Sequence, residues 1–118
     1  MQPANLDLTI YKGSTFVKTI QWKTGDPAVA VDLTGCTARM QVRKNPSDSV
    51  ILESLTTSNA KIVITQPTNG KLEIRIPAET STAYTFQCGV YDLEIVFPDG
   101  TVTRIIEGDF VAVPEVTR

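Results

Sequence analysis

Polar and hydrophobic residues alternate most regularly in the last third of the chain. One face of the stretch from residue 90 to residue 97 carries apolar side chains: Tyr91, Leu93, Ile95 and Phe97. The other face carries Asp92 and Glu94. A period of two is typical of a β-strand with one buried face. A second β-rich stretch follows Pro98-Asp99-Gly100, so we predict one long antiparallel hairpin over residues 89–114.

The turn of this hairpin determines which residues face each other. A type I turn over residues 97–100, with Gly100 in the left-handed conformation, places Glu94 opposite Arg104. A two-residue loop would instead direct Arg104 onto the apolar face. We favour the first arrangement because opposite charges on a solvent face are stabilising, whereas an unpaired buried arginine is costly.

The second strand does not keep a period of two along its whole length. The favoured register sets Leu93 opposite Ile105, yet Phe110 faces inward only if one extra residue is inserted between them. A β-bulge at Glu107-Gly108 is the simplest explanation, because glycine is common at bulges.

The end of the chain supplies the candidate interface residues. With a bulge in the strand, Val111 and Val113 are exposed apolar residues on the face opposite Phe110, where a partner could cover them. Without the bulge they belong to the core, and the sequence leaves both options open. Together with the tail that follows, the candidate interface residues are Val111, Val113, Glu115 and Arg118.

Other stretches also have strand character, and turn residues separate them about every ten residues. The predicted strands are residues 6–11, 16–22, 29–33, 36–44, 50–55, 62–66 and 71–76. Residues 62–76 are predicted to form a second hairpin, with Ile62 opposite Ile76 and Ile64 opposite Ile74, and residues 77–82 a single helical turn. This pattern predicts an all-β fold, an antiparallel immunoglobulin-like β-sandwich of about seven to nine strands.

The bulk composition narrows the class of protein. The 118 residues carry a net charge of −2 without basic clusters, so we predict one domain, residues 1–118, that binds no nucleic acid. Residues 115–118 are expected to form a free tail. We find no signal-peptide pattern and no apolar stretch of the ~20 residues that cross a bilayer. We therefore expect synthesis in the cytoplasm and no association with a membrane.

Residues that carry chemistry are sparse. The chain has no histidine, which excludes histidine-based triads and histidine zinc ligands. Asp92 and Glu94 share a strand face, but carboxylates beside an arginine are typical of a solvated surface. Three aspartates lack the oxygen-rich spacing of a calcium loop: Asp26, Asp99 and Asp109. We therefore predict a protein that is not an enzyme and that binds no cofactor or metal.

The two cysteines, Cys36 and Cys88, lie far apart in the sequence. A disulfide between the two sheets is one interpretation. We favour two reduced core thiols, because free cysteine is often buried and no secretion signal is seen.

Three stretches resemble a family of small proteins from tailed bacteriophages and prophages. They are DLTIYKGSTF (7–16), VDLTGCTARMQVR (31–43) and VYDLEIVFPDGTVTRIIEGDFVAVPEVTR (90–118). In that family an "LTIYKG-T-F" strand runs to a tryptophan, here Trp22. The chain is also similar to the N-terminal immunoglobulin-like domain of siphophage baseplate upper proteins. The resemblance covers nearly the whole chain.

This resemblance implies a virion structural protein without catalytic residues. We expect a protein of the tail or baseplate that contacts other virion proteins and forms a homo-oligomer in the particle through strand edges and loops. A head decoration protein is a close alternative. A host-surface or carbohydrate-binding module is another, and an exposed aromatic shelf would favour it, built from Tyr11, Trp22 or Tyr84.

Overall fold

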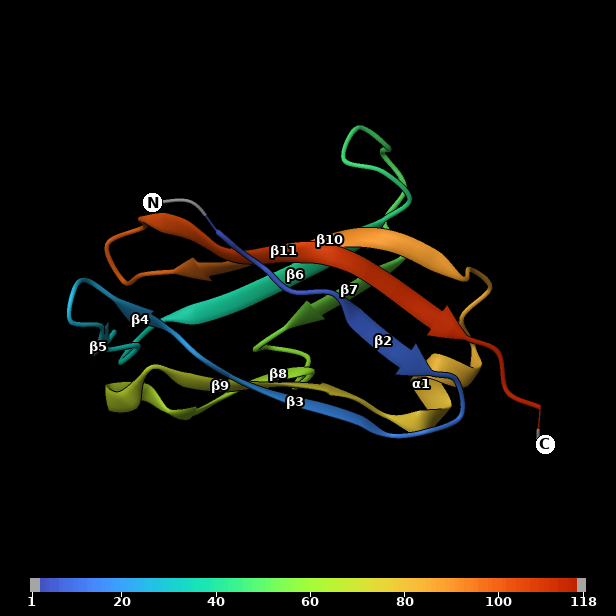
Figure 1. The fold of residues 1–118 in the computed structure, drawn as a ribbon, viewed down its shortest axis with the longest axis horizontal. Helices are drawn as coiled ribbons and strands as arrows, with labels where there is room; N and C mark the ends of the chain where they lie inside the picture. The colour runs from blue at the N-terminus through green and yellow to red at the C-terminus, as the bar shows by residue number, and fades with distance from the viewer. Residues whose placement is uncertain (1–2, 117–118) are drawn as a thin grey trace.

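The computed structural model describes residues 3–116, which fold into two facing β-sheets and one short α-helix (Figure 1). The elements in chain order are β1 (Ala4–Asn5), β2 (Leu8–Tyr11), β3 (Phe16–Gln21), β4 (Lys23–Thr24), β5 (Val29–Ala30), β6 (Thr37–Arg43), β7 (Glu53–Thr56), β8 (Ile62–Gln66), the 3₁₀ helix η1 (Pro67–Asn69), β9 (Lys71–Ile76), α1 (Ala78–Thr82), β10 (Cys88–Val96) and β11 (Val102–Val113). The β-sandwich prediction and the helical turn before β10 are confirmed.

The larger sheet, sheet A, has the strand order β1-β11-β10-β6-β7, with β2 also pairing with β11. The smaller sheet, sheet B, has the order β3-β9-β8, and β4 and β5 form a separate short pair. Most pairs are antiparallel, but β1 and β2 both run parallel to β11. The two strands occupy successive parts of the same edge, so the first and last strands of the chain close one side of sheet A.

The hydrophobic core lies between the two sheets. Side chains with no exposed surface come from both layers: Ile10, Val42, Leu55, Leu72, Ile74, Ile76, Leu93, Ile95 and Phe110. They sit at alternate positions of their strands, as the sequence pattern predicts for half-buried strands. Burying each such side chain contributes roughly 1.5–3 kcal/mol of hydrophobic stabilisation. The core therefore holds the two sheets together.

The hairpin of β10 and β11 has the predicted turn, but its bulge lies elsewhere. Gly100 has a φ of +91°, and Glu94 is opposite Arg104. Leu93, however, is opposite Ile106, so Ile105 is the extra residue. Both isoleucines are buried, because a bulge allows two neighbouring side chains to face the core. The predicted bulge at Glu107-Gly108 is therefore wrong.

Gly108 has a different role, which is to let the N-terminal edge approach β11. A Cβ atom at this position would overlap the carbonyl of Leu6. The backbone N–H of Leu6 donates to the carbonyl of Glu107 at 2.9 Å, and the buried hydroxyl of Tyr91 donates to the carbonyl of Leu6. Tyr91 is thus a core tyrosine that anchors the break between β1 and β2.

The second hairpin is shifted by two residues from the predicted register. Ile62 is opposite Ile74 rather than Ile76, because η1 and a bulge lengthen the connection between β8 and β9. A shift of two residues keeps every side chain on its predicted face. Gly70 closes this turn in the left-handed conformation, with a φ of +65°.

Ala60 adopts a positive φ of +65° in the turn between β7 and β8. A non-glycine residue in this region costs roughly 1–2 kcal/mol. We expect Ala60→Gly to relieve most of this strain. Glycine also has more freedom in the unfolded chain, which offsets part of the gain, so the free energy of unfolding should rise by up to about 1 kcal/mol. Urea unfolding measures the change. A midpoint lower than that of the parent protein would contradict the strain.

Candidate functional site

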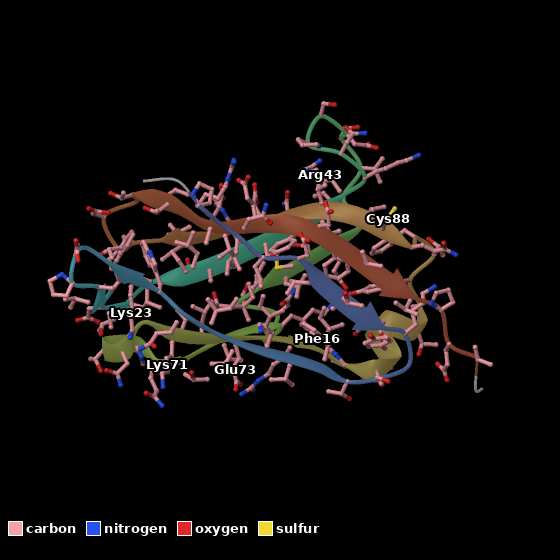
Figure 2. All side chains as sticks on the ribbon, viewed as in Figure 1. Phe16, Lys23, Arg43, Lys71, Glu73 and Cys88 are labelled. Atoms are coloured by element: carbon pink, nitrogen blue, oxygen red, sulfur yellow. The ribbon has the colours of Figure 1, made fainter. Side chains whose placement is uncertain are left out.

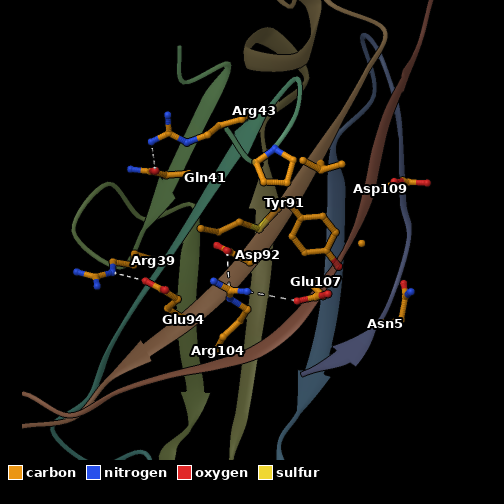
Figure 3. A pocket seen from close by; sticks show the side chains of 14 residues that line it. Asn5, Arg39, Gln41, Arg43, Tyr91, Asp92, Glu94, Arg104, Glu107 and Asp109 are labelled. Atoms are coloured by element: carbon orange, nitrogen blue, oxygen red, sulfur yellow. Dashed lines mark hydrogen bonds and ion pairs between the residues drawn. The ribbon is translucent and has the colours of Figure 1, made fainter. Parts of the chain in front are cut away.

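A depression lies on the outer face of sheet A (Figure 3). It has a volume of about 690 Å³ and is open to solvent on one side. Its floor is formed by outward-facing side chains of β6, β10 and β11, and Asn5 and Gly108 lie at its margin. Because the sandwich core fills the inner face, the charged side chains of these three strands point into this hollow or to solvent.

Ion pairs between neighbouring strands cross the floor of the hollow (Figure 3). Arg39 of β6 donates to Glu94 of β10 at 2.8 Å. Arg104 of β11 lies 3.2 Å from Asp92 and 3.5 Å from Glu107. Thus Arg104 is opposite Glu94 in the ladder, as predicted, but forms its ion pairs with Asp92 and Glu107. The long arginine side chain reaches diagonally, which the register alone does not reveal.

Asp92 of β10 is half-buried in the floor of the hollow. Burial raises the pKa of Asp92, and the neighbouring Arg104 only partly opposes this effect. The pair Asp92 and Glu94 is not arranged as a free acid and base, since each carboxylate is bound by an arginine. The surface is suited to holding a polar partner in one orientation rather than to proton transfer.

One end of the outer face of sheet A is apolar. Val111 points outward with 36% of its surface exposed, and Val113 is half-buried beside Tyr11, which is 60% exposed. The outward position of both valines follows from the bulge in β11, although that bulge lies at Ile105. We call Tyr11, Val111 and Val113 the apolar patch.

The predicted tail is described only in part. Glu115 is half-buried, and its carboxylate lies against Gly13 in the turn after β2. Arg118 lies outside the described residues. The interface role of these two residues and of the valines stays a prediction.

The loop between β6 and β7 projects beyond sheet A (Figure 1). Arg43 fixes its base by donating to the carbonyl of Asp48 at 2.7 Å and to Gln41 at 2.9 Å. Its last residues present two apolar side chains to solvent, Val50 and Ile51. Residues 44–52 thus form a second exposed feature beside the polar hollow.

The three aromatic residues proposed for a sugar-binding shelf do not come together. Tyr11 lies on β2, and Tyr84 is buried with its hydroxyl donating to Glu53 at 2.6 Å. Trp22 is half-buried, and its ring centroid lies 6.0 Å from that of Phe97 at the tip of the β10–β11 hairpin. Without a shared aromatic surface, the observation that would favour carbohydrate binding is missing from the described residues.

Both cysteines are free, but only Cys36 packs against the core. Cys36 is half-buried at the start of β6, and Cys88 is exposed at the start of β10 (Figure 2). Because β6 and β10 are antiparallel, with Thr37 opposite Val96, the two cysteines lie at opposite ends of the pair. Strand geometry separates them by roughly 25–30 Å, far beyond disulfide reach. The prediction of two core thiols is wrong for Cys88, which is exposed, while Cys36 is partly buried against the core.

Within residues 3–116 no group of three or more histidine, cysteine, aspartate or glutamate residues is placed to hold a metal ion. Asp99 accepts a hydrogen bond from the backbone N–H of Thr101, which lowers the pKa of its carboxyl group. No helix in this part of the chain has the length and hydropathy needed to cross a membrane.

Sequence reasoning missed a polar cluster between the two sheets. Glu53 of β7 has a side chain only 10% exposed, and it accepts hydrogen bonds from Tyr84 at 2.6 Å and from Lys61 at 3.2 Å. Burial and this carboxylate raise the pKa of Tyr84. The three residues are up to 31 positions apart in the sequence, so only the fold shows that they pair.

Comparison with known proteins gives one match that covers most of the chain. The family described as "LtfC-like, beta-sandwich domain" matches residues 2–112. The chain belongs to the LtfC-like β-sandwich family. This membership supports an immunoglobulin-like β-sandwich protein of phage origin, as the sequence resemblance implied. LtfC-like sandwiches are typically non-catalytic, and the absence of enzyme activity in this member stays a prediction.

No curated protein matches the sequence of this LtfC-like domain. Among solved structures, it is similar to the immunoglobulin-like domain of mouse leukocyte-associated immunoglobulin-like receptor 1, in a strand-swapped dimer. That match has 13% identity, a TM-score of 0.49, and covers 91% of this chain and 88% of the receptor chain. It is also similar to extracellular domains 3–5 of Drosophila OTK, with 18% identity and a TM-score of 0.40, over 94% of this chain and 33% of that chain.

Proposed function

We propose that this LtfC-like domain is a non-enzymatic structural protein of a bacteriophage virion, associated with the tail or baseplate, that packs into a symmetric assembly. The family supports a phage-related structural domain. The apolar patch carries the assembly part of the proposal, since it turns apolar surface outward: Tyr11 is 60% exposed and Val111 36% exposed. Exposed apolar patches of this kind are typical of interaction sites.

The polar hollow supports a contact role rather than a chemical one. Arg39 already pairs with Glu94 and Arg104 with Asp92, so these charges can give a partner orientation and specificity rather than act as a free acid and base. The projecting loop 44–52 supplies a further contact with Val50 and Ile51. Copies of this chain and other virion proteins are the proposed partners, and the particle is the proposed location.

We expect Val111→Asp to weaken self-association by at least about tenfold, because a carboxylate would be desolvated within the contact. Sedimentation equilibrium over a range of concentrations measures the effect. Val102→Asp is the matched control, since Val102 is 44% exposed on the outer face at the opposite end of β11. This control should associate like the parent protein.

Particles with and without the protein test its location. Difference imaging should show extra density at the tail or baseplate when the protein is present. Density on the capsid would instead favour the head decoration alternative. A parent protein that remains monomeric at high concentration and is absent from purified particles would contradict the proposed function.

A further inference from the structure

Strand β7 forms one edge of sheet A, where its backbone could pair with an additional strand. The N–H of Thr57 donates to the carbonyl of Ala38 in β6 at 3.1 Å. Successive residues of a strand direct their backbone groups to opposite sides. Ser54 and Thr56 therefore direct their N–H and C=O groups away from β6, toward the open edge. Unpaired groups of this kind attract strands of other chains.

Ser54 and Thr56 together have four such groups, an N–H and a C=O each, and side chains form hydrogen bonds with three of them. The carboxamide of Asn59 accepts from the N–H of Thr56 and donates to the carbonyl of Ser54, both at 3.0 Å. One amide thereby makes the two hydrogen bonds that the backbone of an added strand would make. The N–H of Ser54 donates to the carboxylate of Glu53 at 2.9 Å.

Local geometry holds Asn59 in this position. Its N–H donates to the hydroxyl of Thr56 at 3.0 Å, and its side-chain oxygen also accepts from the N–H of Lys61 at 3.1 Å. Ala60 turns the chain with its positive φ so that residue 59 lies against the edge. Glu53 adds a charge that points inward from the edge strand, a feature that discourages pairing with other sheets.

We propose that Asn59 closes the β7 edge of sheet A against strand addition by a second copy of this chain. The carboxamide takes the hydrogen bonds of the missing neighbour, and Glu53 takes one of those that remain. Assembly is thereby directed to other surfaces of the sandwich. This inference does not depend on the proposed function, because it concerns an edge distant from the apolar patch.

The test opens the edge and limits the accompanying loss of stability. Asn59→Ala is introduced together with Ala60→Gly, which offsets the loss of stability, and Ala60→Gly alone is the parent. We expect self-association at least tenfold tighter than that of the parent, measured by sedimentation over a concentration series. Adding Thr56→Pro, which removes an edge N–H, should reverse the gain.

Asn45→Ala is the matched control. The Asn45 carboxamide accepts from Ser47 within the loop 44–52 and has no hydrogen bond to a strand edge. This variant loses the side-chain hydrogen bonds of its turn, as Asn59→Ala does, but opens no strand edge. It should therefore associate like wild type. Because all compared proteins keep the same apolar patch, failure of this inference is distinguishable from failure of the proposed function.

Amide hydrogen exchange gives a second measurement. In the wild-type protein the N–H of Thr56 should be protected, and in monomeric Asn59→Ala/Ala60→Gly it should exchange rapidly. An unprotected Thr56 in the wild type would overturn the inference. The inference would also be overturned if Asn59→Ala/Ala60→Gly exchanged rapidly at Thr56 and yet associated no more tightly than its parent.

Discussion

Leu93→Asp should abolish the cooperative unfolding transition of this protein. Leu93 has no exposed surface and lies at the centre of sheet A, between β6 and β11. A carboxylate there has no polar partner, and burying an unpaired polar group or charge is among the most destabilising single changes. We expect a loss of more than about 4 kcal/mol, comparable with the whole stability of a small domain. Thermal unfolding followed by circular dichroism measures the change.

Leu93→Met is the control for this prediction. A volume-conserving apolar substitution usually costs less than about 1.5 kcal/mol, so the methionine variant should melt cooperatively at a slightly lower temperature. If Leu93→Asp also melted cooperatively near the parent temperature, the inward position of Leu93 would be wrong.

Gly108→Ala should cost about 1–3 kcal/mol, as added volume in a tightly packed site usually does. The new methyl group would overlap the carbonyl of Leu6, and this obstacle is backbone rather than a flexible side chain. The N-terminal edge must then move away from β11 and lose its contact with Tyr91. Urea unfolding gives the free-energy change, and hydrogen exchange at Leu6 shows whether the edge is released.

A truncated protein identifies the cause of this cost. Removal of residues 1–7 eliminates the carbonyl that the new methyl group would strike. In that background Gly108→Ala should be nearly neutral, because the two changes share a contact and are not additive. An equal cost in both backgrounds would show that the strain lies within β11.

The sequence predicted the layers of this fold better than the details of their pairing. Alternation along β10 and β6 identified the buried faces, because each strand has one face in the core. The bulge was misplaced because Ile105 and Ile106 are both apolar, and a period of two cannot show which of them is the extra residue. The bulge was assigned to Gly108 instead, but glycine is needed there because the backbone of Leu6, between β1 and β2, packs against it.

The candidate site was predictable only where a single strand determines it. Val111 faces outward because Phe110 faces inward, and the sequence contains both residues side by side. The partners of Glu94 and Glu53 lie on strands and loops distant in the sequence. These contacts could therefore be predicted only once the topology of the fold was known. Asn59 gave no signal of its own, because a carboxamide in a turn is common and its contact with β7 depends on the tertiary fold.

The parallel pairing of β2 with β11 has a consequence for folding. Asp7 accepts a hydrogen bond from the N–H of Asp109, 102 positions later in the chain. Residue 109 must therefore have left the ribosome before this side of the sandwich can close. Contacts between such distant residues slow folding, and sandwiches of this type typically need roughly milliseconds to seconds. Newly made copies would therefore expose their hydrophobic interior until β11 has left the ribosome.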